Sequence, residues 1–534
     1  MGTSSWFYTC SLIIVVALLC VVTVQQGAVP QMIYAHDCAI VYDAGWRAYC
    51  GLRPHADFYS ALGPFLYLYI GAGFWLFGTT IHAVAYMNAL ALAILTGAVW
   101  FLLRNRMGEF WLFLSSLMVG LCFMAPYTMR NPTVYLSYAL LYNRHGYALI
   151  MLLYMLLFLP RGTASLLQLS ITSFVIGSIL SVLLFAKVSF FMAVVPVTLF
   201  YFFLCRGEEA WIDLKSLAGG FILMSVAFAA YIRFDLMGMY RDLSIASGAK
   251  KHHFAMHWDV YFATVMEMML PAMLCMLITV FGAIWKAECE QKKFSWRMVV
   301  PHIMLVCVLV LSSGFVVFTC AINNLDVDYP LLTSLGVIMF VRAVSRNQIP
   351  ALIWKGMPTA YVAILLLAGY PAVSQVWRDT YSIVQIVPPP EYRMVFNTPA
   401  LQDLVIYPTE RHVGYPPTTN DAVNLIYKHN IAGRKLMSTE FTSLFPFATH
   451  SPSAGGSVFL ESPVNISMDS HPTAEQMFAD AEYLFLTKNP ISPRTVELIH
   501  AVYDPYIHKH YQKLDETPNW LLMERRDIAS AAGR

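Results

Sequence analysis

Charged residues are scarce in this chain. Asp, Glu, Lys and Arg together make up 12% of its 534 residues, whereas 58% are hydrophobic, and an ordinary soluble domain carries roughly 25% charged residues. This scarcity excludes a soluble protein and places most of the chain in lipid. Neither sign of charge dominates, because 34 Lys and Arg nearly balance 32 Asp and Glu. The net charge therefore predicts neither nucleic-acid binding nor an acidic substrate.

Cysteine is absent after residue 320, and most of the ten cysteines lie in or beside apolar segments. No disulfide scaffold is therefore expected. Only Cys38 and Cys50 share a polar loop. If residues 37–50 form one straight helix, their Cα atoms lie about 18 Å apart at 1.5 Å per residue, which is too far for a disulfide. Both are expected to be free thiols.

Long apolar runs predict a polytopic α-helical membrane protein with about eleven transmembrane helices. The first run has no Lys or Arg before it and no good A-x-A site after it, so it is interpreted as an uncleaved helix rather than a signal peptide. Windows long enough to cross about 30 Å of hydrocarbon lie near residues 6–26, 82–103, 109–128, 146–160, 164–185, 188–205, 216–235, 262–285, 299–321, 329–345 and 350–370.

The positions of Lys and Arg predict the orientation of these helices. With a cytoplasmic N-terminus, basic residues such as Arg104, Arg106 and Lys215 fall on the inner side, as the positive-inside rule requires. The apolar run from Gly63 to Gly78 is short for a span and is predicted to be a helix at the outer interface. The outer segments are then 27–81, 129–145, 236–261, 322–328 and everything after about residue 371.

The character of the chain changes after Tyr370, so residues 1–370 and 371–534 are predicted to be a membrane domain and a soluble extracytoplasmic domain. The second region has ordinary polar spacing and predicts a small α/β fold, with strands over 481–486 and 520–524 and a helix over 493–503. It contains no Gly-rich phosphate loop, CxxC pair or HExxH motif. No catalytic chemistry is therefore expected from this domain alone.

The first outer segment, residues 27–81, is the richest in polar side chains. Asp37 follows the first helix closely, where a carboxylate could take a proton from an acceptor hydroxyl. The alternative is that Asp37 caps the next helix. Its neighbour His36 is a further site candidate, and Asp43 and Asp57 are candidates for which a structural role is favoured.

The next outer segment places cations beside aromatic and polar side chains. The candidates are Arg130, Tyr142, Asn143, Arg144 and His145. Arginine suits a phosphate or a carboxylate because its planar fork donates two parallel hydrogen bonds. Anchoring at the membrane interface explains these arginines equally well.

Lys187 is more unusual, because it stands between two apolar runs at the outer end of a helical hairpin. Such a lysine either extends to the interface or holds a lipid phosphate, and the phosphate is favoured. Further cations on the outer side run against the usual charge bias, so they require an anionic partner, either a phosphate or lipid headgroups. Adjacent histidines at 252 and 253 cannot both face one metal from a helix, so no metal site is predicted. These further outer candidates are Arg233, Arg241, Lys250, Lys251 and His252.

The first outer segment resembles the opening of the GT-C glycosyltransferases, and in particular bacterial members allied to protein O-mannosyltransferases, aminoarabinose transferases and lipopolysaccharide galacturonosyltransferases. In that superfamily an acidic residue just after the first helix is the catalytic base, and the resemblance assigns this role to Asp37. The family often has Asp-Glu there, whereas this chain has Asp37-Cys38. The residues that carry the resemblance are Asp37-(x5)-Asp43, Gly51-Leu52-Arg53-Pro54, Asp57-Phe58, Gly63-Pro64-Phe65-Leu66-Tyr67 and Leu76-Phe77-Gly78.

The resemblance implies an inverting glycosyltransferase that moves a sugar from a polyprenyl-phosphate donor to a glycan, lipid or protein acceptor. Lys187, with one or more of Arg130, Arg144, Arg233 and Arg241, would stabilise the leaving phosphate. No cofactor is required; a divalent metal is compatible with this chemistry but is not predicted. The expected partners also include membrane lipids and exclude nucleic acid. The expected location is a bacterial inner membrane, with a periplasmic C-terminal domain.

Two other functions fit a polytopic chain of this size. A transporter or lipid-linked sugar flippase would be expected to show inverted repeats and charges near the midplane of the membrane. Here the charges gather at the outer boundary instead. A non-catalytic assembly or sensor protein would need no carboxylate in the first outer segment, and its activity would not depend on Asp37.

Overall fold

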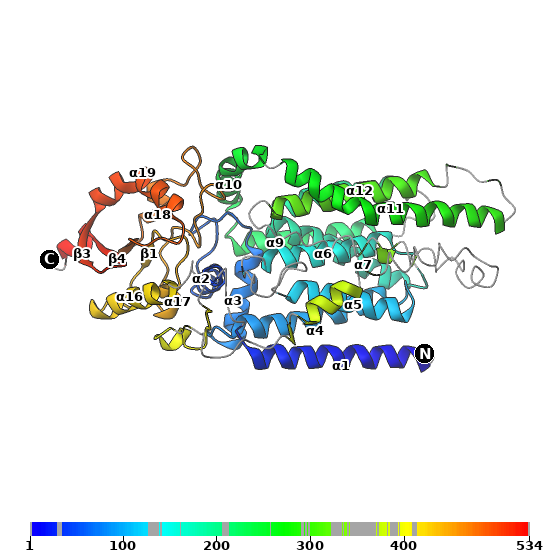
Figure 1. The fold of residues 1–534 in the computed structure, drawn as a ribbon, viewed down its shortest axis with the longest axis horizontal. Helices are drawn as coiled ribbons and strands as arrows, with labels where there is room; N and C mark the ends of the chain where they lie inside the picture. Colours follow the sequence, from blue (N-terminus) through cyan, green and yellow to red (C-terminus); the bar gives the residue numbers. More distant parts are fainter. Residues whose placement is uncertain are drawn as a thin grey trace.

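Long apolar helices run side by side through most of the chain, and a small sheet domain lies at one end of them (Figure 1). The N-terminus lies at the end of the bundle away from this domain, and the C-terminus lies at the outer edge of the domain. The computed structural model describes residues 3–28, 35–125, 138, 141–160, 162–204, 213–256, 258–289, 293, 296, 299–321, 334, 336–338, 341, 370, 373–381, 383–384, 394, 396–407 and 414–531.

Nine of the eleven predicted spans coincide with described helices. They are α1 (Thr3–Gln26), α4 (Ala83–Leu103), α5 (Glu109–Met124), α6 (Leu141–Phe158), α7 (Leu166–Ala186), α8 (Val188–Leu204), α9 (Leu214–Tyr231), α11 (Trp258–Cys289) and α12 (Val300–Ala321). The spans expected at 329–345 and 350–370 fall almost wholly outside the described residues, so the total of eleven stays a prediction.

Five stretches within these helices are long and apolar enough to cross a membrane: Trp6–Gln26, Ala83–Leu103, Leu166–Ala186, Leu214–Tyr231 and Ile303–Cys320. Their side chains are apolar on nearly all faces, as expected for helices that meet lipid or other helices rather than water. The length and composition of these helices are therefore those of an integral membrane protein.

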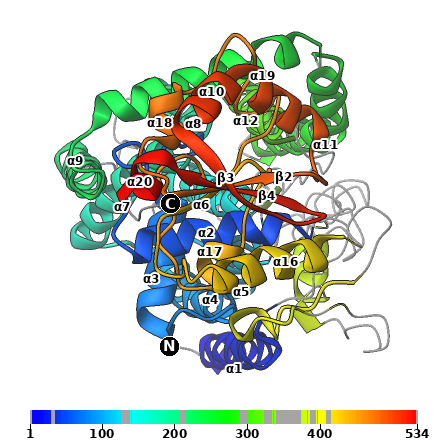
Figure 2. The same cartoon turned by 90° about the vertical axis from the view of Figure 1, so that its left-hand side faces the viewer.

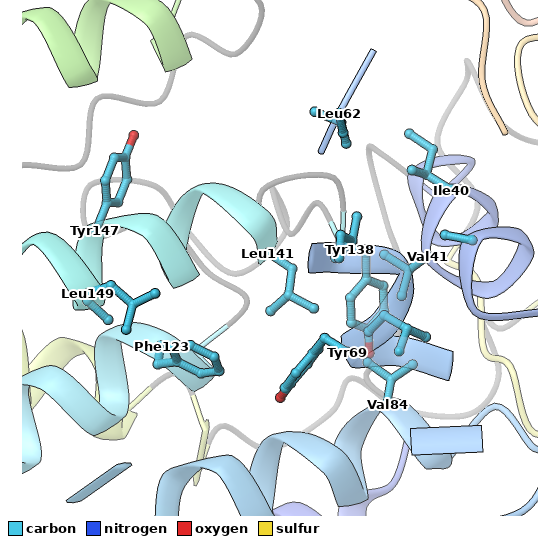
Figure 3. Packing of buried hydrophobic residues seen from close by; sticks show 14 of the residues in the cluster. Ile40, Val41, Leu62, Tyr69, Val84, Phe123, Tyr138, Leu141, Tyr147 and Leu149 are labelled. Atoms are coloured by element: carbon cyan, nitrogen blue, oxygen red, sulfur yellow. The ribbon is translucent and has the colours of Figure 1, made fainter. Parts of the chain in front are cut away.

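Helix α6 lies at the centre of the bundle. All its residues except Tyr142 are buried, which is the pattern of a helix that is surrounded by other helices. Figure 3 shows side chains from neighbouring elements gathered beside it, among them Val41, Tyr69, Val84 and Phe123. This packing fixes the outer end of α6, where several of the predicted site residues lie.

Three helices lie between the bundle and the sheet domain: α2 (Asp37–Tyr49), α3 (Phe65–Phe77) and α10 (Leu236–Met256). Helix α3 confirms a helix in the run from Gly63 to Gly78. The straight helix α2 separates Cys38 from Cys50, and both are free thiols as predicted. Residues 250–253 belong to α10, so the cations of the outer segment 236–261 lie on a helix.

The C-terminal domain contains a four-stranded sheet in the order β1-β2-β4-β3. Strands β2 and β4 confirm the two strands predicted from the sequence, and α19 confirms the helix. In Figure 2 this sheet lies in front of α2. The elements are a 3-10 turn (Pro399–Leu401), α16 (Tyr415–Lys428), β1 (Leu436–Ser438), α17 (Phe445–Ala448), α18 (Ala474–Phe478), β2 (Tyr483–Thr487), α19 (Pro493–His510), β3 (Tyr511–Glu516), β4 (Trp520–Arg525) and α20 (Arg526–Ala531).

The first part of the predicted extracytoplasmic region packs on the bundle. Described residues of 373–384 are helical, and Ile383 is buried against side chains of α1. The buried carboxylate of Asp379 pairs with Arg144 of α6 at 2.8 Å. The compact C-terminal domain starts further along the chain, with the backbone pairing of Met394 and Ile406.

Helix α2 joins the membrane bundle to the C-terminal domain through buried polar contacts. Its Arg47 pairs with Asp43 at 2.8 Å and also donates to the backbone oxygens of Ala454 and Ser457. The hydroxyl of Ser453 donates to the other oxygen of Asp43 at 2.8 Å. The structural interpretation of Asp43 therefore fits its contacts, because both Arg47 and Ser453 belong to this junction.

Replacing Ser453 by Ala is expected to lower the free energy of unfolding by about 1–3 kcal/mol, because a buried carboxylate oxygen of Asp43 loses its donor. Thermal unfolding of the purified protein measures the effect. Ser530 is the matched control, since its exposed hydroxyl donates only to the local backbone oxygen of Arg526, and its Ala variant should unfold like the wild type. Equal stability of the two variants would contradict the role given to this contact.

Candidate functional site

A cavity of about 1010 Å³ lies between the outer ends of the membrane helices and the C-terminal domain. This volume is at the upper end of the range for small-molecule sites, about 300–1000 Å³. Segments far apart in the sequence line it, from the start of α2 to the loop that follows Phe459. The polar side chains in its wall include His36, Asp37, Tyr142, Lys187, Lys250 and Glu461.

Asp37 is the first residue of α2 and is buried, with 6% of its surface exposed. Its carboxylate lies 3.3 Å from Nε2 of His36. The N-cap residue of α2 is His36, and its side chain makes no capping hydrogen bond. Asp37 is therefore not the N-cap residue that the structural alternative expected. A carboxylate in the first turn of a helix is stabilised in its ionised form by the helix dipole. The carboxylate of Asp37 therefore lies in the cavity wall at the first turn of α2.

Lys187 lies at the corner between α7 and α8. Its ammonium group donates to Asn143 Oδ1 at 3.2 Å, to the backbone oxygen of Thr319 at 3.1 Å and to the sulfur of Cys320 at 3.2 Å. It also lies 5.5 Å from the centre of the Tyr142 ring. All of these described contacts are to neutral groups. A phosphate oxygen could replace the thiol sulfur, which is the weakest acceptor of the three.

The glycine of the Gly63-Pro64 motif brings the first outer segment onto this corner. The backbone N–H of Gly63 donates to the oxygen of Ala186 at 3.2 Å. A Cβ at Gly63 would lie 2.0 Å from the backbone oxygen of Phe185, so no other residue fits without moving one of the two segments. The motif therefore places Asp37 and Lys187, which are 150 positions apart, at one cavity.

Two charged groups complete the polar wall. Lys250 of α10 is half-buried; burial and the nearby charge of Lys187 lower the pKa of its ammonium group to about 8, while Cys320 and Glu461 act in the opposite direction. Glu461 belongs to the C-terminal domain. No local motif marks Glu461. Because the sequence predicts no chemistry from this domain alone, the place of Glu461 in the cavity wall was not predicted.

The other walls of the cavity are apolar. Met192 of α8 and Phe318 of α12 belong to membrane helices, and Tyr240 and Trp258 lie at the opening beside α10 and α11. Met192, Tyr240 and Trp258 are exposed on the outer surface of the molecule while they also line the cavity. The apolar lining thus continues onto the surface of the molecule, so a molecule with an apolar tail and a charged head fits both sets of walls.

Arg144 and His145 do not line the cavity. Arg144 is buried, forms the ion pair with Asp379 described above and donates from Nε to the backbone oxygen of Cys122 at 3.1 Å. The imidazole of His145 is stacked on Phe123 with ring centres 4.0 Å apart, and Tyr69 meets its other side. The surroundings of both side chains are those of core residues. Of this sequence motif, Tyr142 and Asn143 contact the cavity lysine.

Asp57, Arg233 and Arg241 lie outside the cavity wall as well. Arg233 is exposed and pairs with Asp57 at 2.8 Å. Asp57 also accepts the backbone N–H of Arg53, which closes a turn in the first outer segment. Arg241 pairs with its neighbour Asp242 at 2.9 Å. The first pair joins Arg233 to the first outer segment, and the second lies within α10. A part for Arg233 or Arg241 in phosphate binding stays a prediction.

Three candidates remain. Lys251 is exposed on α10 and is absent from the cavity wall. Arg130 lies outside the described residues, as does the side chain of His252. Within the described part of the chain, no group of three or more His, Cys, Asp and Glu side chains could hold a metal ion. The absence of a metal requirement therefore stays a prediction.

No family model matches the chain, and no curated protein matches it. The solved structures that resemble it include two of ArnT from Cupriavidus metallidurans. The apo form has a TM-score of 0.41 and 11% identity, over 96% of this chain and 98% of that chain. The form bound to undecaprenyl phosphate has a TM-score of 0.40 and 10% identity, over 98% of each chain. Likeness at these values is a coarse similarity of fold and assigns no residue role.

Proposed function

We propose that this protein is an inverting glycosyltransferase of the membrane, which uses a polyprenyl-phosphate sugar as donor. The observation that supports it most directly is the meeting of two carboxylates, Asp37 and Glu461, and two ammonium groups, Lys187 and Lys250, at a single cavity. The cavity has apolar walls that continue onto the surface of the molecule. The resemblance of the first outer segment to GT-C enzymes points to the same chemistry.

The donor would bind with its tail against the apolar walls near Met192 and Phe318 and its phosphate at the lysines. Lys187 and Lys250 approach the cavity from different elements, so together they can bind separate phosphate oxygens. Positive charge placed where negative charge develops lowers the barrier for departure of the phosphate. The two lysines take the role first assigned to Lys187 and the arginines.

Asp37 would accept the proton of an acceptor hydroxyl as its oxygen attacks C1 of the sugar. The new bond forms on the face of C1 opposite the phosphate, so the configuration inverts. The bond from C1 to the phosphate oxygen breaks, and the phosphate keeps the electron pair. His36, 3.3 Å from the carboxylate, is placed to hold its orientation. The acceptor would be a glycan, a lipid or a protein.

The arrangement of the ends supports the proposed location. The N-terminus and the C-terminal domain lie at opposite ends of the bundle (Figure 1). With a cytoplasmic N-terminus, the cavity and the C-terminal domain face the outer side, which in a bacterium is the periplasm. The inner membrane of a bacterium is therefore the proposed site of action.

Transfer by the purified protein tests this function. The protein in detergent is incubated with polyprenyl-phosphate sugars labelled in the sugar, with water or candidate acceptors, and the released polyprenyl phosphate and labelled product are measured. Reconstitution in vesicles measures movement of the same lipids between leaflets. Product formation in detergent supports the transferase, whereas movement between leaflets without any product would support a flippase and refute the proposal.

The affinity for polyprenyl phosphate is expected to fall as the pH rises above about 8. The pKa of Lys250 is lowered to about 8, so its positive charge is present below that pH and lost above it. The second ionisation of a phosphate monoester, near pH 6, is then already complete. Because one proton is linked to binding, the Kd should rise by at most about tenfold per pH unit. Titrations from pH 7 to 10 measure it.

The matched variant for this titration is Lys250→Met, which keeps the length of the side chain and removes the titrating group. Below pH 8, the Kd of this variant should be larger than that of the wild type. Above pH 8, it should not rise further. If wild type and Lys250→Met show the same dependence on pH, Lys250 does not contact the phosphate.

A further inference from the structure

A second, smaller pocket of about 230 Å³ lies in the C-terminal domain, between the start of α16, the segment after β1 and the loops that border β2 and β4. It is a different space from the large cavity, and the two share no lining residue. Its volume lies below the range of drug-sized sites, about 300–1000 Å³, and suits one small ring-shaped ligand rather than a lipid.

The two pockets lie on opposite sides of one extended segment. Phe441 lines the large cavity, while its neighbours Glu440 and Thr442 line the small pocket. The hydroxyl of Thr442 donates to the backbone oxygen of His36 at 3.2 Å. The small pocket is thus separated from the start of α2, and from Asp37, by the thickness of this segment.

The chemistry of the small pocket selects an uncharged ligand that is rich in hydroxyl groups. The described residues that line it include no Lys, Arg or His, and its one charged group is the carboxylate of Glu440. Glu440 is held rigidly, because it accepts hydrogen bonds from the backbone N–H groups of Phe441 and Ile491 and from the hydroxyl of Thr487. A phosphate or a carboxylate would be repelled.

Two hydroxyl groups in this pocket lack a partner. The oxygen atoms of Tyr415 and Ser443 are buried and make no hydrogen bond to a described residue. Only 6% of the surface of Tyr415 is exposed. A buried hydroxyl without a partner costs about 1–3 kcal/mol, so a ligand that supplies the missing bonds would be stabilised here. Trp520 adds an aromatic surface to the wall.

We propose that this pocket binds one uncharged sugar ring of the acceptor, so that the acceptor is a glycan. The assignment of the sugar to an acceptor rests on the proposed glycosyltransferase function, whereas the binding of a sugar ring does not. The Tyr415 and Ser443 hydroxyl groups and the Glu440 carboxylate bind sugar hydroxyl groups. An adjacent hydroxyl of the same glycan extends past the segment that contains Phe441 towards Asp37.

Direct binding to the full-length protein in detergent tests this site without any transfer reaction. The probes are the methyl glycosides of glucose, mannose, galactose and N-acetylglucosamine, with glucuronate as the charged comparison, and saturation-transfer NMR measures their binding. At least one neutral glycoside is expected to bind, and glucuronate more weakly. Failure of all four neutral glycosides, or preferential binding of glucuronate, would overturn the proposal.

The matched variant is Tyr415→Phe with Ser443→Ala, which removes two hydroxyl groups and leaves the packing of the rings. It should weaken glycoside binding about tenfold, from the loss of two hydrogen bonds. Tyr427→Phe is the control, because Tyr427 lies on the same helix and is exposed. Equal binding by the double variant and the wild type would overturn the site.

The Asp37→Asn variant separates this proposal from the one on which it rests. Glycoside binding by that variant should equal that of the wild type. If Asp37→Asn also transfers sugar at the wild-type rate, the transferase mechanism fails while the sugar site stands. If wild-type protein transfers sugar to glycan acceptors and the double variant does so with an unchanged KM, the pocket is not the acceptor site and the proposal fails.

Discussion

Replacing Asp37 by Asn is expected to lower the rate of sugar transfer by a factor of about 10² to 10⁴, the usual contribution of a positioned general base. Asn has nearly the same size and keeps an oxygen that can face His36, but it cannot take a proton from the acceptor. The carboxylate lies in the first turn of α2 and in the wall of the large cavity, so its loss affects the chemical step. Donor affinity should change little.

Initial rates of transfer at saturating donor, compared with the Kd for polyprenyl phosphate, measure this effect. The matched control is Asp57→Asn, which neutralises a carboxylate of the same outer segment that pairs with Arg233 away from the cavity. Per folded molecule, its rate should stay within about twofold of the wild type. A wild-type rate in Asp37→Asn would refute the assignment of the base.

Replacing Lys187 by Met is expected to lower the transfer rate by a factor of about 10² to 10³, similar to the loss of one preorganised donor at a site of developing charge. Met keeps the length of the stem, and therefore the contacts with the rings of Tyr142 and Phe190. It removes the positive charge beside the leaving phosphate. Binding of polyprenyl phosphate should weaken at the same time, because the product bears the charge that Lys187 stabilises.

The control for Lys187→Met is Lys251→Met, since Lys251 is exposed on α10 and absent from the cavity wall. Rates and Kd values for polyprenyl phosphate are measured for both variants at pH 7. Lys187→Arg is the second comparison and should recover only part of the rate, because a planar fork differs from a compact ammonium group. Equal Kd values in wild type and Lys187→Met would exclude contact between this lysine and the phosphate.

Several elements of the fold follow from local sequence pattern alone. Apolar runs predict the membrane helices because crossing hydrocarbon needs about 20 apolar residues in succession, a property of neighbours in the chain. The apolar run from Gly63 to Gly78 predicts helix α3, and its position at the membrane interface stays a prediction. Short apolar runs that contain aromatic residues predict strands β2 and β4. In each case the determining interactions lie within one segment.

The candidate site was predictable only in part. Asp37 and Lys187 stand out because a charge beside an apolar run is costly, and the cost is visible in the sequence. The same reasoning selected Arg144, yet its partner Asp379 lies 235 positions further along the chain, and no local pattern shows that the two are paired. Glu461 was missed because a single carboxylate in a polar loop has no distinctive neighbours.

The sequence by itself determined that this is a membrane protein with strands and helices near its C-terminus, and that Asp37 and Lys187 are exceptional. Hydropathy and periodicity carry that information because they depend on adjacent residues. Only the tertiary structure decided which charged side chains line the same cavity and which form ion pairs with each other. Gly63 against Phe185, Arg47 against Asp43 and the C-terminal domain bring distant segments together, and the function proposed here depends on those contacts.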